Sequence, residues 1–339
     1  MTTVFIHAEM TESDIYEKVD QTTRFVIMED HYPLSPYAPP GSEQFIYDLF
    51  KQFPDCLFVT AVCRPSPYEN EIWFPFYFMQ TIKDNPRWIP DFDTVRPKTA
   101  NAIGGQTRIA RTLSSFWLAK HYPKEQLLDR FMQNDSLDNV IRIIENSTYY
   151  NKKHLHPKKF LLDKFVHTDE DIVNEIVLPD NIAQSYLAFV PEATGVELGA
   201  RLTEGTYLPL VGGNLYIPVG NYQGHKVLEQ LGFDMFTDVF KFDSLNSDDR
   251  YRMSIGVLED NKAITTDHQI IEQIWFDNTK RLAHNHNLTQ DLGHFMEHFK
   301  PTIQTLSESL KYVDLETMQF LPEFRNMASI YFWLKDFSQ

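Results

Sequence analysis

An acid after an apolar run, and a threonine–glutamate pair that begins eleven residues further on, combine residue types that bind hydroxyls and phosphates. The run Tyr186–Val190 predicts a buried strand, and Pro191 stops it so that Glu192 lies where that strand would end. In open α/β sheets, ligands bind beyond the carboxyl ends of the strands. Thr203 can cap a helix whose first turn carries Glu204, and free N–H groups at such a helix start attract phosphate.

A second strand, a glycine turn and a helix follow this pair. Leu215–Val219 is again apolar and predicts another buried strand, and the turn Gly220–Gly224 leads into the amphipathic segment Lys226–Leu231. His225 lies in that turn. Strand, helix, strand and helix in this order predict a βαβα unit with a polar rim at one end, which is the usual housing for a nucleotide.

Two arginines earlier in the chain have the spacing of a phosphate clamp. Gly104-Gly105 allows a tight turn after a short β-like segment, and Arg108 and Arg111 then stand three residues apart at the start of a predicted helix. On one face of a first turn, two guanidinium groups can hold a pyrophosphate. The alternative is that both arginines are solvated or pair with nearby acids, and the sequence leaves this open.

The stretch from Gln184 to Phe233 resembles the donor-binding half of GT-B glycosyltransferases, most closely fucosyltransferase-like enzymes and related viral proteins. The matching positions are Glu192, Thr203-Glu204, Gly212-Gly213, Ile217-Pro218-Val219-Gly220 and Leu228 through Phe233. Arg108 and Arg111 match the R-x-x-R of that family's nucleotide domain. One position departs from the pattern, because the family's lysine is Gly205 here. The resemblance covers roughly a third of the chain.

The resemblance implies two Rossmann-like α/β domains facing each other, with a helical C-terminal segment, and metal-independent sugar transfer from a nucleotide-sugar donor to a hydroxyl. In that family the glutamates and the lysine contact the ribose and phosphates of a nucleotide sugar. Here either the two arginines supply the charge missing at Gly205 and hold the diphosphate, or the site does not bind a diphosphate. No cofactor is implied beyond the donor substrate. The implied donor site comprises Arg108, Arg111, Glu192, Thr203, Glu204, Gly220 and His225.

The acceptor stays open between DNA, glycan, protein and small molecule. Hydroxylated bases in phage DNA are one acceptor class of GT-B enzymes, and the basic segment Lys152–Lys159 is compatible with it, whereas the net charge of −16 opposes it. If the anomeric centre is inverted, the hydroxyl needs a general base. Asp30 or Glu29, which close the predicted strand Arg24–Met28, are the candidates; the alternative is that they cap the turn before Pro33.

Two rival functions remain. The glycine at position 205 favours a catalytically silent nucleotide-binding or interaction protein. His294, Glu297 and His298 spell H-x-x-E-H, which would support a zinc hydrolase if a third ligand came from the last 40 residues, although neighbouring Phe and Met residues favour a packing helix. The D-x-D spelling at Asp91–Asp93 lies in a proline-rich segment and gives little support to a metal site.

Composition sets the broad class. The chain has 339 residues, of which 42% are hydrophobic, so it can build more than one core. Only two cysteines are present, Cys56 and Cys63, and they predict buried thiols in a reducing compartment. No secretion signal and no apolar stretch of membrane-spanning length stands out in the sequence, so the expected location is the cytoplasm, the host's if the protein is viral.

Alternating apolar runs and helical patterns predict an α/β protein. The segment Asn85–Pro97 contains three prolines and is the best linker candidate. We therefore expect an acceptor-side domain over residues 1–97, a nucleotide-sugar domain over 98–270, and C-terminal helices over 271–339 that pack back on the first domain. Trp73–Ile82 is expected as strand or irregular chain, and Phe236–Phe242 as a further strand.

Overall fold

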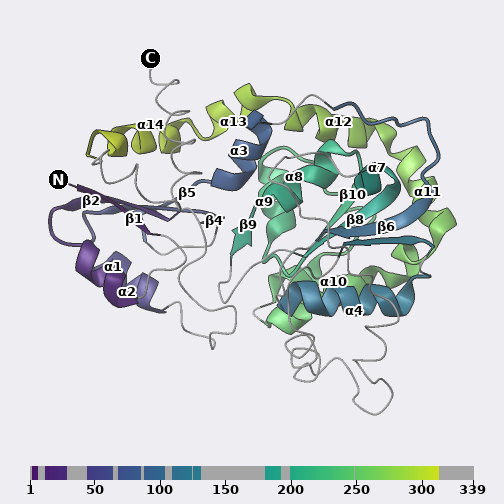
Figure 1. Ribbon diagram of the computed structural model, residues 1–339, viewed down its shortest axis with the longest axis horizontal. Coiled ribbons are helices and arrows are strands. Elements are labelled where there is room, and N and C mark those ends of the chain that lie inside the picture. The colour runs from purple at the N-terminus through teal and green to yellow at the C-terminus, as the bar shows by residue number, and fades with distance from the viewer. Residues whose placement is uncertain are drawn as a thin grey trace, which may run out of the picture. The chain divides into compact units, whose positions relative to one another are not determined.

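The computed structural model describes most of the chain: residues 2–6, 12–28, 44–63, 68–84, 88–103, 109–123, 125–130, 180–191, 199–247 and 249–312. These form a mixed α/β protein with parallel sheets and two compact units (Figure 1). Unit 1 comprises Met1–Gln80, Gly195–Arg201 and Leu292–Gln339, and unit 2 comprises Thr81–Thr194 and Leu202–Asp291. The chain thus passes from one unit to the other after residues 80, 194, 201 and 291. The sequence instead predicts domain boundaries after residues 97 and 270.

Unit 1 contains a four-stranded parallel sheet. Its strands are β1 (Thr2–Ile6), β2 (Thr23–Met28), β3 (Leu57–Thr60) and β5 (Glu71–Trp73), hydrogen-bonded in that order. Each strand lies beside its predecessor in the chain, apart from the short β4, so the order never reverses. Helices α1 (Glu12–Lys18) and α2 (Gln44–Gln52) lie along this sheet (Figure 1).

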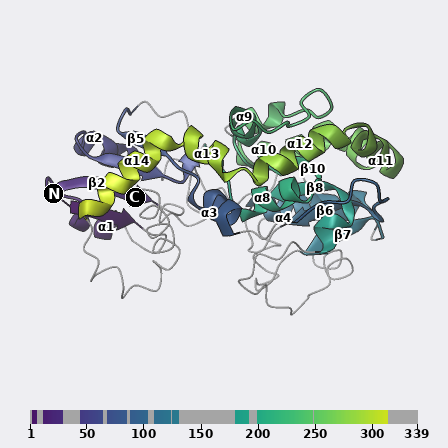
Figure 2. The same ribbon diagram turned by 90° about the horizontal axis from the view of Figure 1, so that it is seen from above.

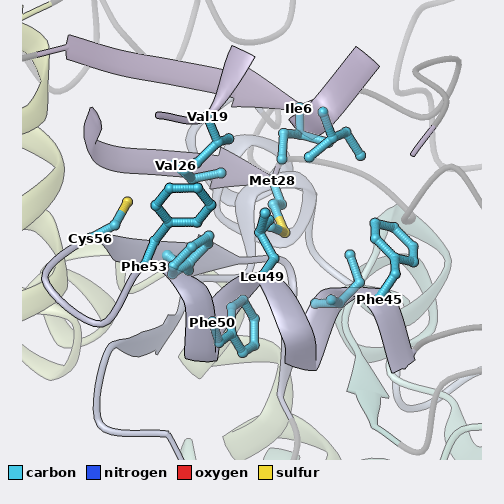
Figure 3. Packing of buried hydrophobic residues seen from close by; sticks show 12 residues of the cluster. Ile6, Val19, Val26, Met28, Phe45, Leu49, Phe50, Phe53 and Cys56 are labelled. Atoms are coloured by element: carbon cyan, nitrogen blue, oxygen red, sulfur yellow. The ribbon is translucent and has the colours of Figure 1, made fainter. Parts of the chain in front are cut away.

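The core of unit 1 is apolar and aromatic (Figure 3). Phe45, Ile46, Leu49 and Phe50 recur at helical spacing, and that buried stripe of α2 was predicted from the sequence. Phe50 packs on Phe58 of β3 with ring centroids 4.6 Å apart. Burial of such side chains is the main favourable contribution to folding of this unit.

Further elements complete unit 1. Strand β4 (Val62–Cys63) pairs antiparallel with β9 (Ala200–Arg201), which the chain inserts between two elements of unit 2. Helices α13 (Leu292–His298) and α14 (Lys300–Ser309) and the short η2 (Leu310–Tyr312) also belong here. The Thr3 hydroxyl donates to the carbonyl of Ser309 at 2.7 Å, which ties β1 to the end of α14.

One expectation for unit 1 was partly wrong. Trp73–Ile82 was expected as strand or irregular chain, but only Trp73 ends a strand, and α3 (Phe76–Asp84) follows. Phe78 and Met79 are fully buried in that helix, and Phe78 packs on Phe295 at 5.8 Å. Aromatic residues favour strands in isolation, and here tertiary packing outweighs that preference.

Unit 2 contains a second four-stranded parallel sheet. Its strands are β6 (Lys98–Ile103), β7 (Leu127–Arg130), β8 (Ser185–Pro191) and β10 (Leu215–Val219), in the spatial order β10-β8-β6-β7 (Figure 2). Every residue of β8 and β10 is buried, as expected for apolar strands covered on both faces.

Helices cover both faces of this sheet. On one face α4 (Ile109–His121) packs beside α10 (Arg250–Thr265), and on the other α8 (Glu204–Val211) packs against α12 (Thr279–Thr289) (Figure 1). Unit 2 also includes α7 (Asp180–Ala183), α9 (Gly224–Gln230), η1 (Asp243–Asn246) and α11 (His268–Asp277). In the described part of the chain, no helix combines the length and apolar character that a membrane span needs.

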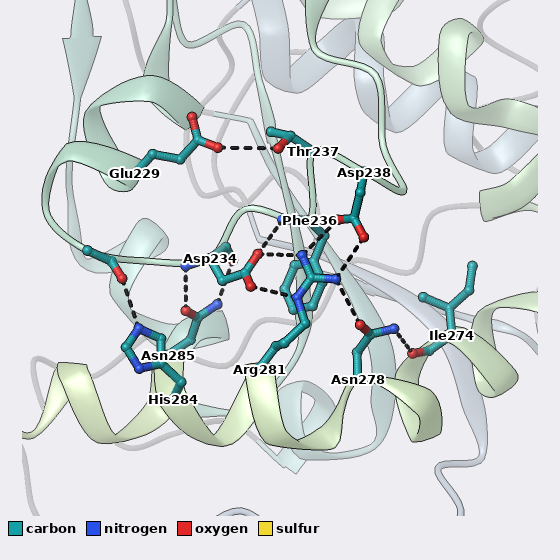
Figure 4. A network of polar contacts seen from close by, with 11 residues as sticks. Glu229, Asp234, Phe236, Thr237, Asp238, Ile274, Asn278, Arg281, His284 and Asn285 are labelled. Carbon is teal, nitrogen blue, oxygen red and sulfur yellow. Dashed lines mark hydrogen bonds and ion pairs between the residues drawn. The ribbon is translucent and has the colours of Figure 1, made fainter.

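The expected strand at Phe236–Phe242 is wrong. These residues form turns, and Phe236 has a positive φ of 55°. A polar network fastens the segment to α12 (Figure 4): Arg281 bonds Asp234 at 2.6 and 2.7 Å and Asp238 at 2.7 and 3.1 Å, while its guanidinium lies over the Phe236 ring. Bonds to Arg281 lower the pKa of both aspartates.

The described part of the expected linker packs within unit 2. Arg96 is buried, donates to the carbonyls of Ser185 and Gly212 at 2.7 and 3.0 Å, and lies over the Trp275 ring. Burial lowers its pKa to about 10, so the guanidinium is charged at neutral pH. A buried cation thus anchors the chain just before β6 to the amino end of β8.

Candidate functional site

The strand order of unit 2 defines one position for a ligand. From β6 the chain goes to β7 on one side, and then returns to β8 and β10 on the other side. The switch point therefore lies between β6 and β8, at their carboxyl ends, where doubly wound sheets bind ligands. In the sequence, Ile103 of β6 is followed by the segment that reaches Arg108, and Pro191 of β8 by Glu192.

The start of α4 lies against the turn that follows β10. Gly220 has a positive φ of 68°, and a Cβ at this position would lie 2.5 Å from the Cβ of Ala110. The backbone of the turn therefore touches the first turn of α4, in which Arg111 is the next residue. The amide of Gly220 also donates to the carbonyl of Met253 at 3.2 Å, so α10 supports the same turn. Only a glycine fits here.

The start of α8 lies beside the carboxyl end of β8. A Cβ at Gly205 would lie 3.5 Å from a methyl group of Val190. The predicted cap at Thr203 is confirmed: its hydroxyl accepts from the amide of Gly205 at 3.1 Å, and the Thr206 hydroxyl accepts from the amide of Thr203 at 3.2 Å. This capping box uses N–H groups that the sequence expectation left free for a phosphate.

The turn between β10 and α9 is tightly built. Asn221 is fully buried, and a Cβ at Gly224 would lie 2.6 Å from its side-chain nitrogen. Gln223 has a φ of 51°, and its amide donates to the carbonyl of Leu245 at 3.0 Å. The turn is therefore a fixed element of unit 2.

His225 lies in the first helical turn of α9, directly after the loop from β10, and its side chain is buried without a full set of hydrogen bonds. It is 5% exposed, and its ring stacks on Phe242 with centroids 4.9 Å apart and planes at 20°. Its Nδ1 is buried and has no hydrogen-bond partner in the described structure. Burial lowers the pKa of His225 to about 4, so the imidazole is neutral at physiological pH and offers one donor and one acceptor.

The remaining predicted residues are described incompletely or not at all. Arg111 and Glu204 lie in the first turns of α4 and α8, and the structure describes their backbone alone. Four other members of the predicted sites lie outside the described residues, as does the basic segment Lys152–Lys159: Arg108, Glu192, Glu29 and Asp30.

Sequence reasoning missed the residues that pack against the Gly220–Gly224 turn and support it. Phe242, Asn221 and Ser254 support the turn, and a Cβ at Gly220 would lie 3.3 Å from the Ser254 hydroxyl. Ser254 and Phe242 are distant in the chain from the turn, so no local pattern relates them to it. The buried Asn221 was the available signal, because a polar residue between two turn glycines is often held by its own hydrogen bonds.

The metal motifs gain no support from the described residues. Asp91 accepts from the backbone of Asp93 and from Thr94, so it closes a local turn. His294 and His298 share α13, whose Glu297 pairs with Lys300 at 3.0 Å. Across the described ranges, no group of three or more His, Cys, Asp or Glu side chains could hold a metal ion.

Comparison with known proteins adds no identity. No protein-family model and no curated protein matches the sequence.

Proposed function

We propose that the protein is a metal-independent glycosyltransferase that binds a nucleotide-sugar donor in unit 2 and transfers the sugar to a hydroxyl. In this proposal the two units act as the facing, Rossmann-like domains of a GT-B enzyme. The observation that supports the proposal is the switch point between β6 and β8, because in the sequence Arg108 and Arg111 follow β6 and Glu192 follows β8.

Each donor contact has a role that its chemistry suits. Arg111, in the first turn of α4, and Arg108, which precedes that helix in the sequence, would hold the diphosphate and stabilise the charge that develops as it leaves. Glu192 or Glu204 would accept hydrogen bonds from the ribose hydroxyls. The Gly220 turn would let the donor approach the backbone, and the neutral His225 would form a hydrogen bond without adding charge.

The capping box at α8 sharpens this assignment. Because Thr203 and Thr206 already satisfy N–H groups at the helix start, the diphosphate must gain most of its binding energy from side-chain cations. This makes the two arginines more important than the helix start. Asp30 or Glu29 would take the proton from the attacking hydroxyl, and the electron pair of the broken bond would leave with the diphosphate.

A thermal-denaturation screen over UDP, GDP, CMP, ADP and dTDP tests the donor site. A nucleotide at a hundredfold excess over its dissociation constant should stabilise the protein by about 2.7 kcal/mol. The matching nucleotide sugar should also be hydrolysed slowly without an acceptor. If none of the five raises the melting temperature, the proposal is wrong.

A catalytically silent nucleotide-binding protein is the second candidate, and Gly205 is the observation in its favour. This protein would show the thermal shift without any hydrolysis of the nucleotide sugar. A zinc hydrolase built on His294 and His298 would instead carry stoichiometric zinc and ignore nucleotides, which metal analysis on the same sample would reveal.

A further inference from the structure

A second group of polar side chains lies in unit 1, at the carboxyl end of β3. The Thr60 hydroxyl is 3.2 Å from the Glu71 carboxylate and donates to the carbonyl of Val62 at 3.1 Å. In the parallel pairing, Phe58 lies opposite Glu71 and Thr60 opposite Trp73. Paired residues of a sheet project from the same face, so Thr60, Glu71 and Trp73 share one face.

Trp73 brings a hydrogen-bond donor to this group. The side chain is half-buried and packs edge-on against Phe299 with centroids 5.2 Å apart. Its Nε1 is buried and has no acceptor in the described structure. An indole N–H usually finds an acceptor when it is buried, and leaving it without one destabilises the protein. A ligand oxygen would satisfy this donor.

The rest of the group adds a neutral thiol and a buried guanidinium. The Cys63 thiol lies in β4, and burial together with the charge of Glu71 raises its pKa to about 11. The thiol is therefore protonated at neutral pH and is not a nucleophile. Arg201, on β9 opposite Val62, is buried. A carboxylate acceptor, an indole donor and an aromatic face together match adjacent hydroxyls on a ring.

We propose that Glu71 and Trp73 form a binding subsite in unit 1 for a vicinal diol of a sugar-like ring, with Glu71 accepting from one hydroxyl and Trp73 Nε1 donating to its neighbour. That this diol belongs to the sugar acceptor rests on the proposed function. Glu29 and Asp30, the predicted base, directly follow Met28, whose register partner is Thr60. The subsite on β5 is thus separated by β3 alone from β2, the strand after which the base was predicted.

The test uses the full chain and intrinsic tryptophan fluorescence. Wild-type protein is titrated with methyl glucoside and methyl galactoside, and with tetrahydropyran as a ring without hydroxyls. A saturable change with at least one glycoside, and none with tetrahydropyran, is expected. Trp73→Phe keeps the aromatic packing but removes the N–H. Because it also removes the fluorescent reporter, its glycoside binding is measured by calorimetry, and we expect that binding to be lost.

Glu71→Gln keeps the shape of the side chain but removes its charge, and should weaken glycoside binding about tenfold. The matched control is Glu69→Gln, an exposed acid two residues earlier, which should titrate like wild type. Unchanged melting temperatures of the variants without ligand show that they fold. Absence of a nucleotide-induced thermal shift in wild type counts against the proposed function alone. If neither glycoside gives a saturable change, or Glu71→Gln binds as wild type does, the subsite is disproved.

Discussion

The two parallel sheets of this protein have four strands each, yet they present their carboxyl ends differently. In unit 1 the order β1-β2-β3-β5 runs in one direction, and no switch point exists among the described strands. In unit 2 the order is β10-β8-β6-β7: the chain leaves β6 towards β7 on one side and later adds β8 and β10 on the other side. The connections that follow β6 and β8 therefore diverge, which in doubly wound sheets leaves a crevice at the strand ends. The strand order alone thus predicts a ligand position in unit 2. In unit 1 the proposed ligand position rests on the chemistry of the side chains.

The two units also differ in what stabilises their sheets. The core around α2 in unit 1 is made of apolar and aromatic side chains (Figure 3). Unit 2 adds buried polar groups, among them Arg96 and Asn214, which donates to the carbonyls of Ile182 and Ser185 at 2.9 and 2.6 Å. Buried polar groups fix a single arrangement only if they keep their partners, so unit 2 should be more sensitive to single substitutions.

The largest expected effect comes from Gly220→Val. The new side chain would collide with Ala110, and a β-branched residue is strained at a φ of 68°. We expect a loss of about 3 kcal/mol or more in the free energy of unfolding, measured by urea denaturation. Gly205→Ala is the control, because its Cβ would meet atoms at 3.3 and 3.5 Å without a positive φ. Equal stability of the two variants would contradict the described packing of the turn.

Arg96→Met is expected to have the next largest effect. It leaves the Gly212 carbonyl without its guanidinium partner and removes the cation from the Trp275 ring. The expected loss is about 2–3 kcal/mol in the free energy of unfolding. Arg24→Met in unit 1 is the control, since Arg24 is exposed and makes one bond to the Asp55 carbonyl. Hydrogen exchange should show faster opening of β6 and β8 in Arg96→Met, with β2 unchanged.

His225 predicts a pH dependence of unit 2. Its pKa falls from 6.5 in the unfolded chain to about 4 in the folded protein, so the unfolded state binds more protons between these values. The stabilising contribution is complete above about pH 6.5 and is lost as the pH falls towards about 4, by at most about 1.4 kcal/mol per pH unit. Stability curves of wild type and His225→Gln should converge as the pH falls over that window. Parallel curves would argue against a buried neutral imidazole.

The smallest expected effect is a gain. Gly205→Lys restores the cation found in the resembled family, at the first turn of α8 beside Val190. If a diphosphate binds at this edge, the variant should bind it about fivefold more tightly. Gly205→Gln, of similar length but uncharged, controls for bulk. Calorimetric titration with the nucleotide found in the thermal screen gives the comparison, and equal affinities of the two variants would remove position 205 from the site.

Much of this fold was predictable because its signals are local. The buried strands β2, β8 and β10 are apolar runs, the α2 stripe is periodic, and Thr203 is a standard cap. What the sequence did not predict depends on distant partners. Arg96 is buried between the Trp275 ring and two backbone carbonyls, and β9 pairs with β4 of unit 1. The turns at Phe236–Phe242 form because Arg281 holds them.

The most direct test of the donor site is nucleotide binding by the Arg108→Ala/Arg111→Ala double variant, measured by calorimetry. The structure describes the start of α4 beside the turn at Gly220, and the account requires these arginines to hold the diphosphate. We predict that the double variant keeps the wild-type melting temperature without ligand and loses at least about tenfold in nucleoside diphosphate affinity. Wild-type affinity in the double variant would contradict the account.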